Sequence, residues 1–128
     1  MLSPGDAFLI PDSHGGKHIF IVISDPQANP HQIVLVPLTS WEDYKDDTCV
    51  LEPDDCPDEP FVTHTSCIDF QESLLTSEAV LTELVAGGKA KKRKRWSSDL
   101  IQKIRTRAAE SQRIPNRCLM VLQTQNLL

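Results

Sequence analysis

The chain has few aromatic residues and no long apolar run. Phe, Trp and Tyr make up 5% of its 128 residues, while hydrophobic residues make up 40%. A core can therefore form, but its side chains must be mainly aliphatic. No apolar run approaches the roughly 20 residues that a membrane-spanning helix needs, so no membrane association is expected. The length is that of one ordinary domain, and we predict a single domain over residues 1–128.

The start of the chain lacks the charged segment and long apolar run of a secretory signal peptide. We therefore expect a cytoplasmic protein whose four cysteines, Cys49, Cys56, Cys67 and Cys118, are reduced. Three of them form the pattern C-x6-C-x7-H-x2-C with His64. This spacing lacks the paired short intervals of common structural zinc sites, so burial as small hydrophobic side chains is the simpler interpretation. Neither a metal nor another cofactor is predicted.

Charge is distributed unevenly along the chain, although the net charge is only −5. Residues 42–59 contain nine acidic residues and a single base, Lys45. Residues 89–95 contain six bases, and little acid follows them. The acidic balance disfavours a general nucleic-acid coat. The basic segment has three interpretations: a solvated linker between helices, a binding surface for an RNA backbone, or a contact for an acidic partner segment.

The first half of the chain has the short apolar runs of β-strands. Strands are predicted at residues 7–10, 17–24 and 48–51, with further strand material at 61–62 and 67–70. The run IVLV at residues 33–36, with three β-branched residues, predicts a strand buried on both faces. Pro37 and Leu38 then lead to a hydroxyl pair, Thr39 and Ser40. This pair either begins a turn or belongs to a site at the strand end.

From residue 76 the apolar spacing becomes helical. Ser77 can cap a helix that Gly87 and Gly88 end, and Ser97 or Ser98 can cap a second helix that stops before Pro115. Residues 116–122 predict a last short helix or strand. Strands followed by helices indicate an α+β, mostly β, fold in which helices pack on a small antiparallel sheet. The boundaries are a β part over about 4–72, a helical part over about 76–122, and a basic linker at 87–96.

Three segments, in order, resemble the MazF/PemK toxins, the endoribonucleases of type II toxin–antitoxin systems. The first is the Gly-Asp turn before a strand, Pro4-Gly5-Asp6-Ala7-Phe8-Leu9-Ile10. The second is a glycine-rich loop that leads into an aliphatic strand, Gly15 to Ser24, and the third is the strand that ends in a Thr-Ser pair, Val34 to Ser40. A later match is a Ser before an apolar strand, Thr65 to Asp69. The resemblance covers about residues 4–85.

The resemblance implies a small SH3-like antiparallel barrel followed by two to three helices. It also implies metal-independent cleavage of single-stranded RNA, a homodimer and inhibition by a cognate antitoxin. In the family, an Arg after the glycine-rich loop and the Thr at the end of the third strand are the catalytic pair. The Thr is present as Thr39, but His18 occupies the Arg position and Ile19 the following Pro position. Either another residue carries the chemistry or this chain has lost it.

Histidine suits acid–base chemistry because its unperturbed pKa is about 6.5. His18 could transfer protons but loses the bidentate phosphate contact of an Arg, and Thr39 could orient the phosphate. We therefore predict His18 and Thr39 as catalytic residues. The predicted RNA-binding residues are Gly15, Gly16, Lys17, Ser40, His64, Ser66, Lys92, Arg93 and Arg95. The exposed-loop interpretation of His14 is preferred over a role in the site.

Two functions of different classes fit the sequence. The first is an endoribonuclease toxin of a toxin–antitoxin pair. The alternative is a non-catalytic toxin-like barrel that binds a protein partner, either as a gyrase poison does or as a degenerate regulatory copy. The ordered motifs and Thr39 favour the first, whereas the missing Arg at position 18 and the acidic net charge favour the second.

Overall fold

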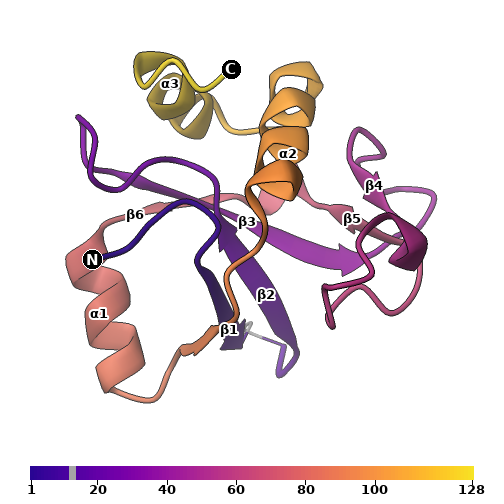
Figure 1. Cartoon of the computed structure of the whole chain (residues 1–128), viewed down its shortest axis with the longest axis horizontal. Coiled ribbons are helices and arrows are strands. Elements are labelled where there is room, and N and C mark those ends of the chain that lie inside the picture. The colour runs from indigo at the N-terminus through magenta and orange to yellow at the C-terminus, as the bar shows by residue number, and fades with distance from the viewer. Residues whose placement is uncertain (12–13) are drawn as a thin grey trace.

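A computed structural model describes residues 1–11 and 14–128 of the chain (Figure 1). The described residues form seven strands and three α-helices, with two short 3-10 helices at Pro53–Asp55 and Phe70–Glu72. The strands are β1 (Ala7–Pro11), β2 (Lys17–Val22), β3 (Ile33–Ser40), β4 (Val50–Leu51), β5 (Ser66–Ile68), β6 (Leu74–Thr76) and β7 (Lys91–Arg93). The helices are α1 (Glu78–Ala86), α2 (Ser98–Glu110) and α3 (Asn116–Thr124). The predicted α+β fold is confirmed.

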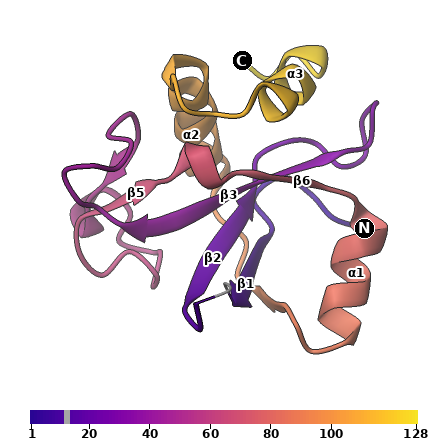
Figure 2. The same cartoon turned by 180° about the vertical axis from the view of Figure 1, so that it is seen from behind.

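The strands form one antiparallel sheet in the order β4-β5-β3-β2-β1-β7, with β6 also paired to β3. The sheet is strongly curled in both views (Figures 1 and 2). The two ends of the order, β4 and β7, do not pair, so the sheet over the described residues is open and not a closed barrel.

Side chains along the central strands alternate between the two faces of the sheet, as the pleat requires. One face carries the larger core, which α2 and α3 cover; the other carries a smaller core, which α1 covers (Figure 2). The strand β3 contributes to both, and its first six residues are buried. The prediction of a strand buried on both faces is therefore confirmed. The larger core includes Ile19, Ile21, Val34, Val36, Ile101, Ile104 and Val121, and the smaller one includes Phe8, Val22, Ile33, Leu35 and Leu81.

Pro37 lies at a break in the hydrogen bonding along one edge of β3. On that edge, β6 pairs with residues 33–35 and β5 with residues 38–40. The carbonyl oxygen of Pro37 accepts a hydrogen bond from the backbone nitrogen of Asp69 at 3.0 Å, so its backbone faces this edge. Proline has no N–H to donate, and the gap between β5 and β6 demands none there. The break lets β3 continue beyond its core-forming half to Thr39 and Ser40.

Several local predictions need correction. Residues 61–62 lie in a turn, and the strand predicted at 67–70 starts at Ser66 and ends at Ile68. The short strand β6 was not predicted. The basic segment 87–96 is more than a linker, because β7 within it pairs with β1 and extends the sheet. The strands β5, β6 and β7 are each three residues long, too short to show the alternation that identifies a strand in the sequence.

The Gly5-Asp6 turn contacts the segment that leads from β7 to the start of α2 and holds it against the sheet. The carboxylate of Asp6 is 1% exposed and lies 2.8 Å from Nε of Arg95 and 3.8 Å from Nζ of Lys92. The backbone nitrogen of Trp96 donates to the carbonyl oxygen of Gly5 at 2.9 Å. Gly5 has φ +91°, and a Cβ there would lie 2.7 Å from the carbonyl oxygen of Trp96. A glycine is therefore required by both conformation and space.

Replacing Gly5 by Ala should be more destabilising than the same change at Gly88. Both glycines have positive φ, but a Cβ at Gly88 meets no atom within 4 Å. We expect Gly88→Ala to lower the free energy of unfolding by about 1 kcal/mol, which is the conformational cost alone. Gly5→Ala should cost more than about 2 kcal/mol, because backbone atoms must also move. Urea unfolding of the two variants checks this, and equal losses would show that the contact with Trp96 is unimportant.

Candidate functional site

The end of β3 and the start of β2 bring the two predicted catalytic residues together. The β2–β3 ladder ends with Ile19 opposite Leu38, so one step further along the same register places His18 across from Thr39. Both side chains are partly exposed. The arrangement that the catalytic prediction needs, two neighbouring accessible side chains, is therefore present.

His18 and Thr39 line two cavities at this end of the sheet. One cavity, of about 260 Å³, is also lined by Lys17, Ser40 and His64, together with Leu9, Ile19, Leu38, Phe61 and Ser66. We call it the strand-end cavity. The second, of about 360 Å³, is lined by His14, Phe20, Pro37, Asp69, Glu72 and Leu74. The strand-end cavity carries the basic and hydroxyl groups, whereas the second cavity adds two carboxylates, which would repel a phosphate.

A short hydrogen bond joins two residues of the strand-end cavity. Oγ of Ser40 lies 2.6 Å from Nε2 of His64, and Nδ1 of His64 lies 3.0 Å from Oγ1 of Thr63. In the tautomer with its proton on Nδ1, the ring donates to Thr63 and accepts from Ser40. Ser40 and His64 are exposed, so a substrate can reach them. The imidazole is thus held by both nitrogens while its face stays open.

Ser66, predicted to bind RNA, has a supporting position instead. It is 2% exposed, and its hydroxyl donates to the carbonyl oxygen of His64 at 2.9 Å. It pairs with Ser40 in the β3–β5 ladder, and the backbone nitrogen of Trp41 donates to Thr65 in the next step. Ser66 therefore fixes the backbone that carries His64, and its hydroxyl is already engaged.

Lys45 reaches the same strand end from the acidic segment. Its ammonium Nζ donates to Oγ1 of Thr39 at 3.0 Å and to the carbonyl oxygen of Ser40 at 2.7 Å. The predicted catalytic hydroxyl therefore has a cation beside it. The acidic segment 42–59 thus contributes its single base to this strand end.

The predicted basic surface divides between the two faces of the sheet. Lys92 and Arg95 lie against Asp6, as described above. Arg93 lies opposite Ala7 in the β1–β7 ladder, and its guanidinium carbon lies 5.6 Å from the centre of the Phe61 ring, a residue of the strand-end cavity. Of these three residues, only Arg93 is placed next to the strand-end cavity.

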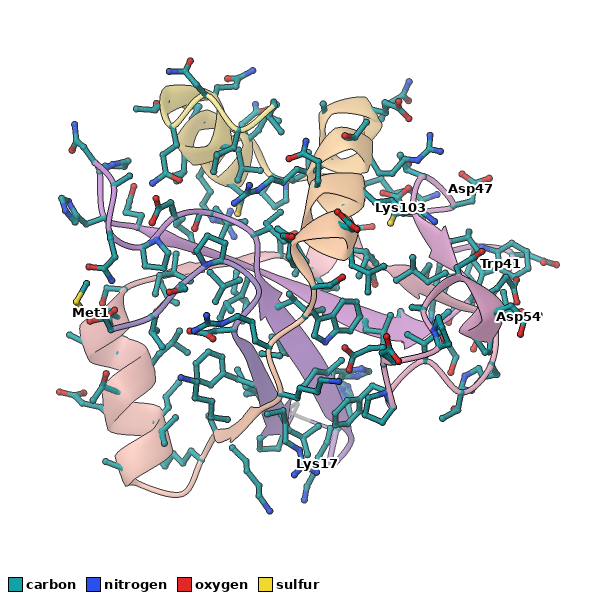
Figure 3. All side chains as sticks on the ribbon, in the orientation of Figure 1. Met1, Lys17, Trp41, Asp47, Asp54 and Lys103 are labelled. Carbon is teal, nitrogen blue, oxygen red and sulfur yellow. The ribbon has the colours of Figure 1, made fainter. Side chains whose placement is uncertain are left out.

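The glycine-rich loop and Lys17 lie at the open rim. Gly15 has φ +84° with open space around it, and Gly16 and Lys17 are also exposed. Figure 3 shows Lys17 extending away from the start of β2. Lys17 also lines the strand-end cavity, so its ammonium is available to an anion that enters there.

The cysteines are buried free thiols. Burial raises the pKa of Cys49 to about 12 and the pKa of Cys67 to about 11. Both thiols are therefore protonated and unreactive at neutral pH. Within residues 1–11 and 14–128, no group of three or more His, Cys, Asp or Glu side chains is placed to hold a metal ion.

Sequence reasoning missed three contributors to the site. Lys45 was visible as the lone base among nine acids, which was the available signal. Thr63 and Phe61 gave no signal, because their roles depend on a turn whose path is set by contacts with β3 and β7. The hydroxyl of Thr63 and the ring of Phe61 contact His64 and Arg93 respectively.

Comparison with protein-family models and with curated protein sequences found no match for the chain. In the part of the chain that the structure describes, every helix is too short or too polar to cross a bilayer. Over the described residues the protein has an α+β fold with an open antiparallel sheet. At the end of β3, the hydroxyl of Ser40 and the imidazole of His64 form a hydrogen-bonded pair.

The free energy of unfolding should depend on pH through Asp46, which follows Lys45 in the loop between β3 and β4. Burial acts to raise the pKa of Asp46, but hydrogen bonds from Ser111 and Thr48 outweigh it and hold this pKa below its ordinary value of 3.8. A depressed folded-state pKa contributes stability that is present above the ordinary value and is lost as pH falls through the folded-state value. Asp46→Asn should therefore be less stable than wild type at pH 7, with the difference shrinking toward pH 3.

Urea unfolding between pH 3 and pH 7 measures this difference. The matched control is Asp47→Asn, which changes an exposed neighbour that Figure 3 shows at the outer edge of the loop. The control should retain the pH dependence of the wild type. A wild-type advantage over Asp46→Asn that stays constant down to pH 3 would contradict the assignment.

Proposed function

We propose that this protein is a metal-independent endoribonuclease that cleaves single-stranded RNA at the strand-end cavity, acting as the toxin of a toxin–antitoxin pair. The observation that carries the proposal is the 2.6 Å hydrogen bond between Ser40 and His64, in a cavity that His18 and Thr39 also line. His64 and His18 are both lining residues of this cavity, and RNA cleavage requires a pair of proton-transfer groups, a role that histidine suits. The resemblance of the ordered motifs to MazF/PemK toxins supports the same function.

The reaction consists of one displacement at phosphorus. The 2′-oxygen of the ribose forms a bond to phosphorus, and the bond from phosphorus to the 5′-oxygen breaks. The proton of the 2′-hydroxyl goes to one imidazole, and the other imidazole, in its protonated form, gives a proton to the leaving 5′-oxygen. The products are a 2′,3′-cyclic phosphate and a 5′-hydroxyl, and no other reactant is consumed. His64, oriented by Thr63, is the candidate for the first transfer, and His18 for the second.

The surroundings of the cavity favour a single-stranded substrate. Phe61 offers an aromatic side chain at the cavity wall, and Arg93 lies 5.6 Å from its ring centre. Bases of an unpaired strand stack on such side chains, while bases in a duplex already stack on one another. The resemblance adds two partners to the proposal, a cognate antitoxin and a second copy of the chain in a homodimer.

RNA cleavage in the presence of EDTA tests the function directly. A long unstructured RNA should give discrete fragments with wild-type protein, and His64→Ala, His18→Ala and Thr39→Ala should each slow cleavage by about 10²- to 10⁴-fold. The control variant is His31→Asn, which changes an exposed histidine just before the opposite end of β3 and suits its φ of +65°. This variant should cleave at the wild-type rate.

Intact RNA after incubation with the wild-type protein would contradict the proposal. Growth arrest on induction, without RNA cleavage, would then favour the non-catalytic toxin-like barrel that acts on a protein partner. Intact RNA together with normal growth would favour a degenerate regulatory copy. Cleavage that survives in all three variants would place the active site elsewhere in the molecule.

Two adjacent basic residues should differ in their effect on RNA binding. Arg93 lies beside the cavity wall, whereas Lys92 points to the other face and lines an apolar cavity there with Leu2, Phe8 and Leu81. Arg93→Gln should reduce by about one the slope of the logarithm of affinity against the logarithm of salt concentration. Lys92→Gln should leave this slope unchanged. Equal slopes for both variants would exclude a specific RNA path over Arg93.

A further inference from the structure

We propose that Lys45 is the phosphate-binding cation of this site and takes over the electrostatic role that the resembled family gives to an arginine after its glycine-rich loop. The inference rests on the proposed function, because the phosphate in question is that of the RNA backbone. Neither the position of Lys45 in the sequence nor the family motifs assign it this role. Three observations carry the inference: where the ammonium lies, how its loop is held, and what surrounds it.

The ammonium lies at the junction of the two hydroxyl residues. It contacts the side chain of Thr39 at 3.0 Å and the backbone of Ser40 at 2.7 Å, and the side chain of Ser40 in turn contacts His64. The ammonium therefore lies directly beside the hydroxyl of Thr39, a residue that lines the strand-end cavity. Positive charge next to the reacting phosphorus is the main requirement for stabilising the crowded dianionic transition state.

The loop around Lys45 is fixed on both sides of this residue. On one side, the carbonyl oxygen of Tyr44 accepts a hydrogen bond from Nη1 of Arg113 at 2.9 Å. On the other side, the carboxylate of Asp46 is 4% exposed and accepts hydrogen bonds from Oγ of Ser111 at 2.6 Å and from the backbone of Thr48 at 2.9 Å. Both anchors come from the segment after α2, so the tertiary fold sets the position of the lysine.

Over the residues that the structure describes, Lys45 forms no close ion pair with a carboxylate. Its two hydrogen-bond partners are a hydroxyl and a carbonyl oxygen, and the ion pairs found over the described residues involve Asp6 and Glu110 instead. Ordering a lysine side chain costs conformational entropy. The two hydrogen bonds of Lys45 to neutral oxygens offset only part of this entropy cost, whereas a bound phosphate would add a charge-assisted hydrogen bond.

The exchange of partners on binding needs no proton transfer to or from Lys45. The ammonium keeps its three protons and directs one of them to a non-bridging phosphate oxygen. Its hydrogen bond to the hydroxyl of Thr39 is then broken or shared with the phosphate. Thr39 can then donate its own proton to the same phosphate. A lysine binds as a point charge and lacks the fork of an arginine, so orientation of the phosphate falls to the hydroxyl groups.

The test combines binding and cleavage in the full-length protein. Binding is measured with a fluorescent single-stranded 2′-O-methyl RNA, which cannot be cleaved because its nucleophile is blocked. Lys45→Met should weaken binding about tenfold, lower the salt slope by about one, and slow cleavage of ordinary RNA by about 10²- to 10³-fold. Lys45→Arg should restore much of the binding, since it keeps the charge. The matched control is Lys103→Met on α2, a half-buried lysine that lines a different cavity.

The outcomes separate this inference from the proposed function. Wild-type cleavage that is unchanged in Lys45→Met would overturn the inference and leave the function standing. Binding that depends on Lys45 without any cleavage would overturn the function and leave the phosphate site standing. A wild-type protein that neither binds the 2′-O-methyl RNA nor cleaves ordinary RNA would overturn both.

The anchor gives a second, independent measurement. If Ser111 acts through the position of Lys45, Ser111→Ala should slow cleavage in the wild-type background and have no further effect in Lys45→Met. Such non-additivity is expected only for residues that act on the same step. Additive losses, or a loss that follows the fall in thermal stability of each variant, would assign Ser111 a structural role only and remove this support for the inference.

Discussion

The structure depends on β3, a strand that has neighbours on both edges and cores on both faces. One edge of β3 pairs with β2. The other edge pairs with β6 before Pro37 and with β5 after it. A one-residue slip of register would exchange the side chains of β3 that pack in the larger core with those that pack in the smaller one, so the packing of both cores fixes the register. This constraint fixes where the strand ends, and hence where Thr39 and Ser40 stand.

The polar groups at the end of β3 come from two kinds of element, a buried strand and the surface segments that contact it. The hydroxyls of Thr39 and Ser40 come from the most constrained strand of the molecule, while His64 and Lys45 come from a turn and a loop that contact it. Each of the latter two is held by neighbours: Thr63 and Ser66 position the histidine, and Ser111 and Arg113 hold the loop of the lysine. Preorganised groups of this kind are what binding of a charged substrate requires.

Acid and base in this chain have more specific uses than their clustering suggests. The buried carboxylate of Asp6 holds Arg95 and Lys92, so two cations of the basic segment serve to attach β7 and the start of α2. In the acidic segment, Asp46 anchors the loop that carries Lys45. Charge patterns in the sequence thus revealed where charged groups are concentrated, but not the tertiary partners of the two carboxylates: Arg95 lies 89 residues from Asp6, and Ser111 lies 65 residues from Asp46.

The sequence by itself determined the features that depend on near neighbours. The apolar runs of β1, β2 and β3, the cap Ser77 of α1, the cap Ser97 of α2, and the strand-before-helix order were all readable, because periodicity and capping are local. The ordered motifs predicted that His18 and Thr39 are neighbours, and the register of the β2–β3 ladder leads toward them. Tertiary structure alone decided the short strands β6 and β7, the contact of Ser40 with His64, and the path of Lys45, because each forms between segments with no local signal.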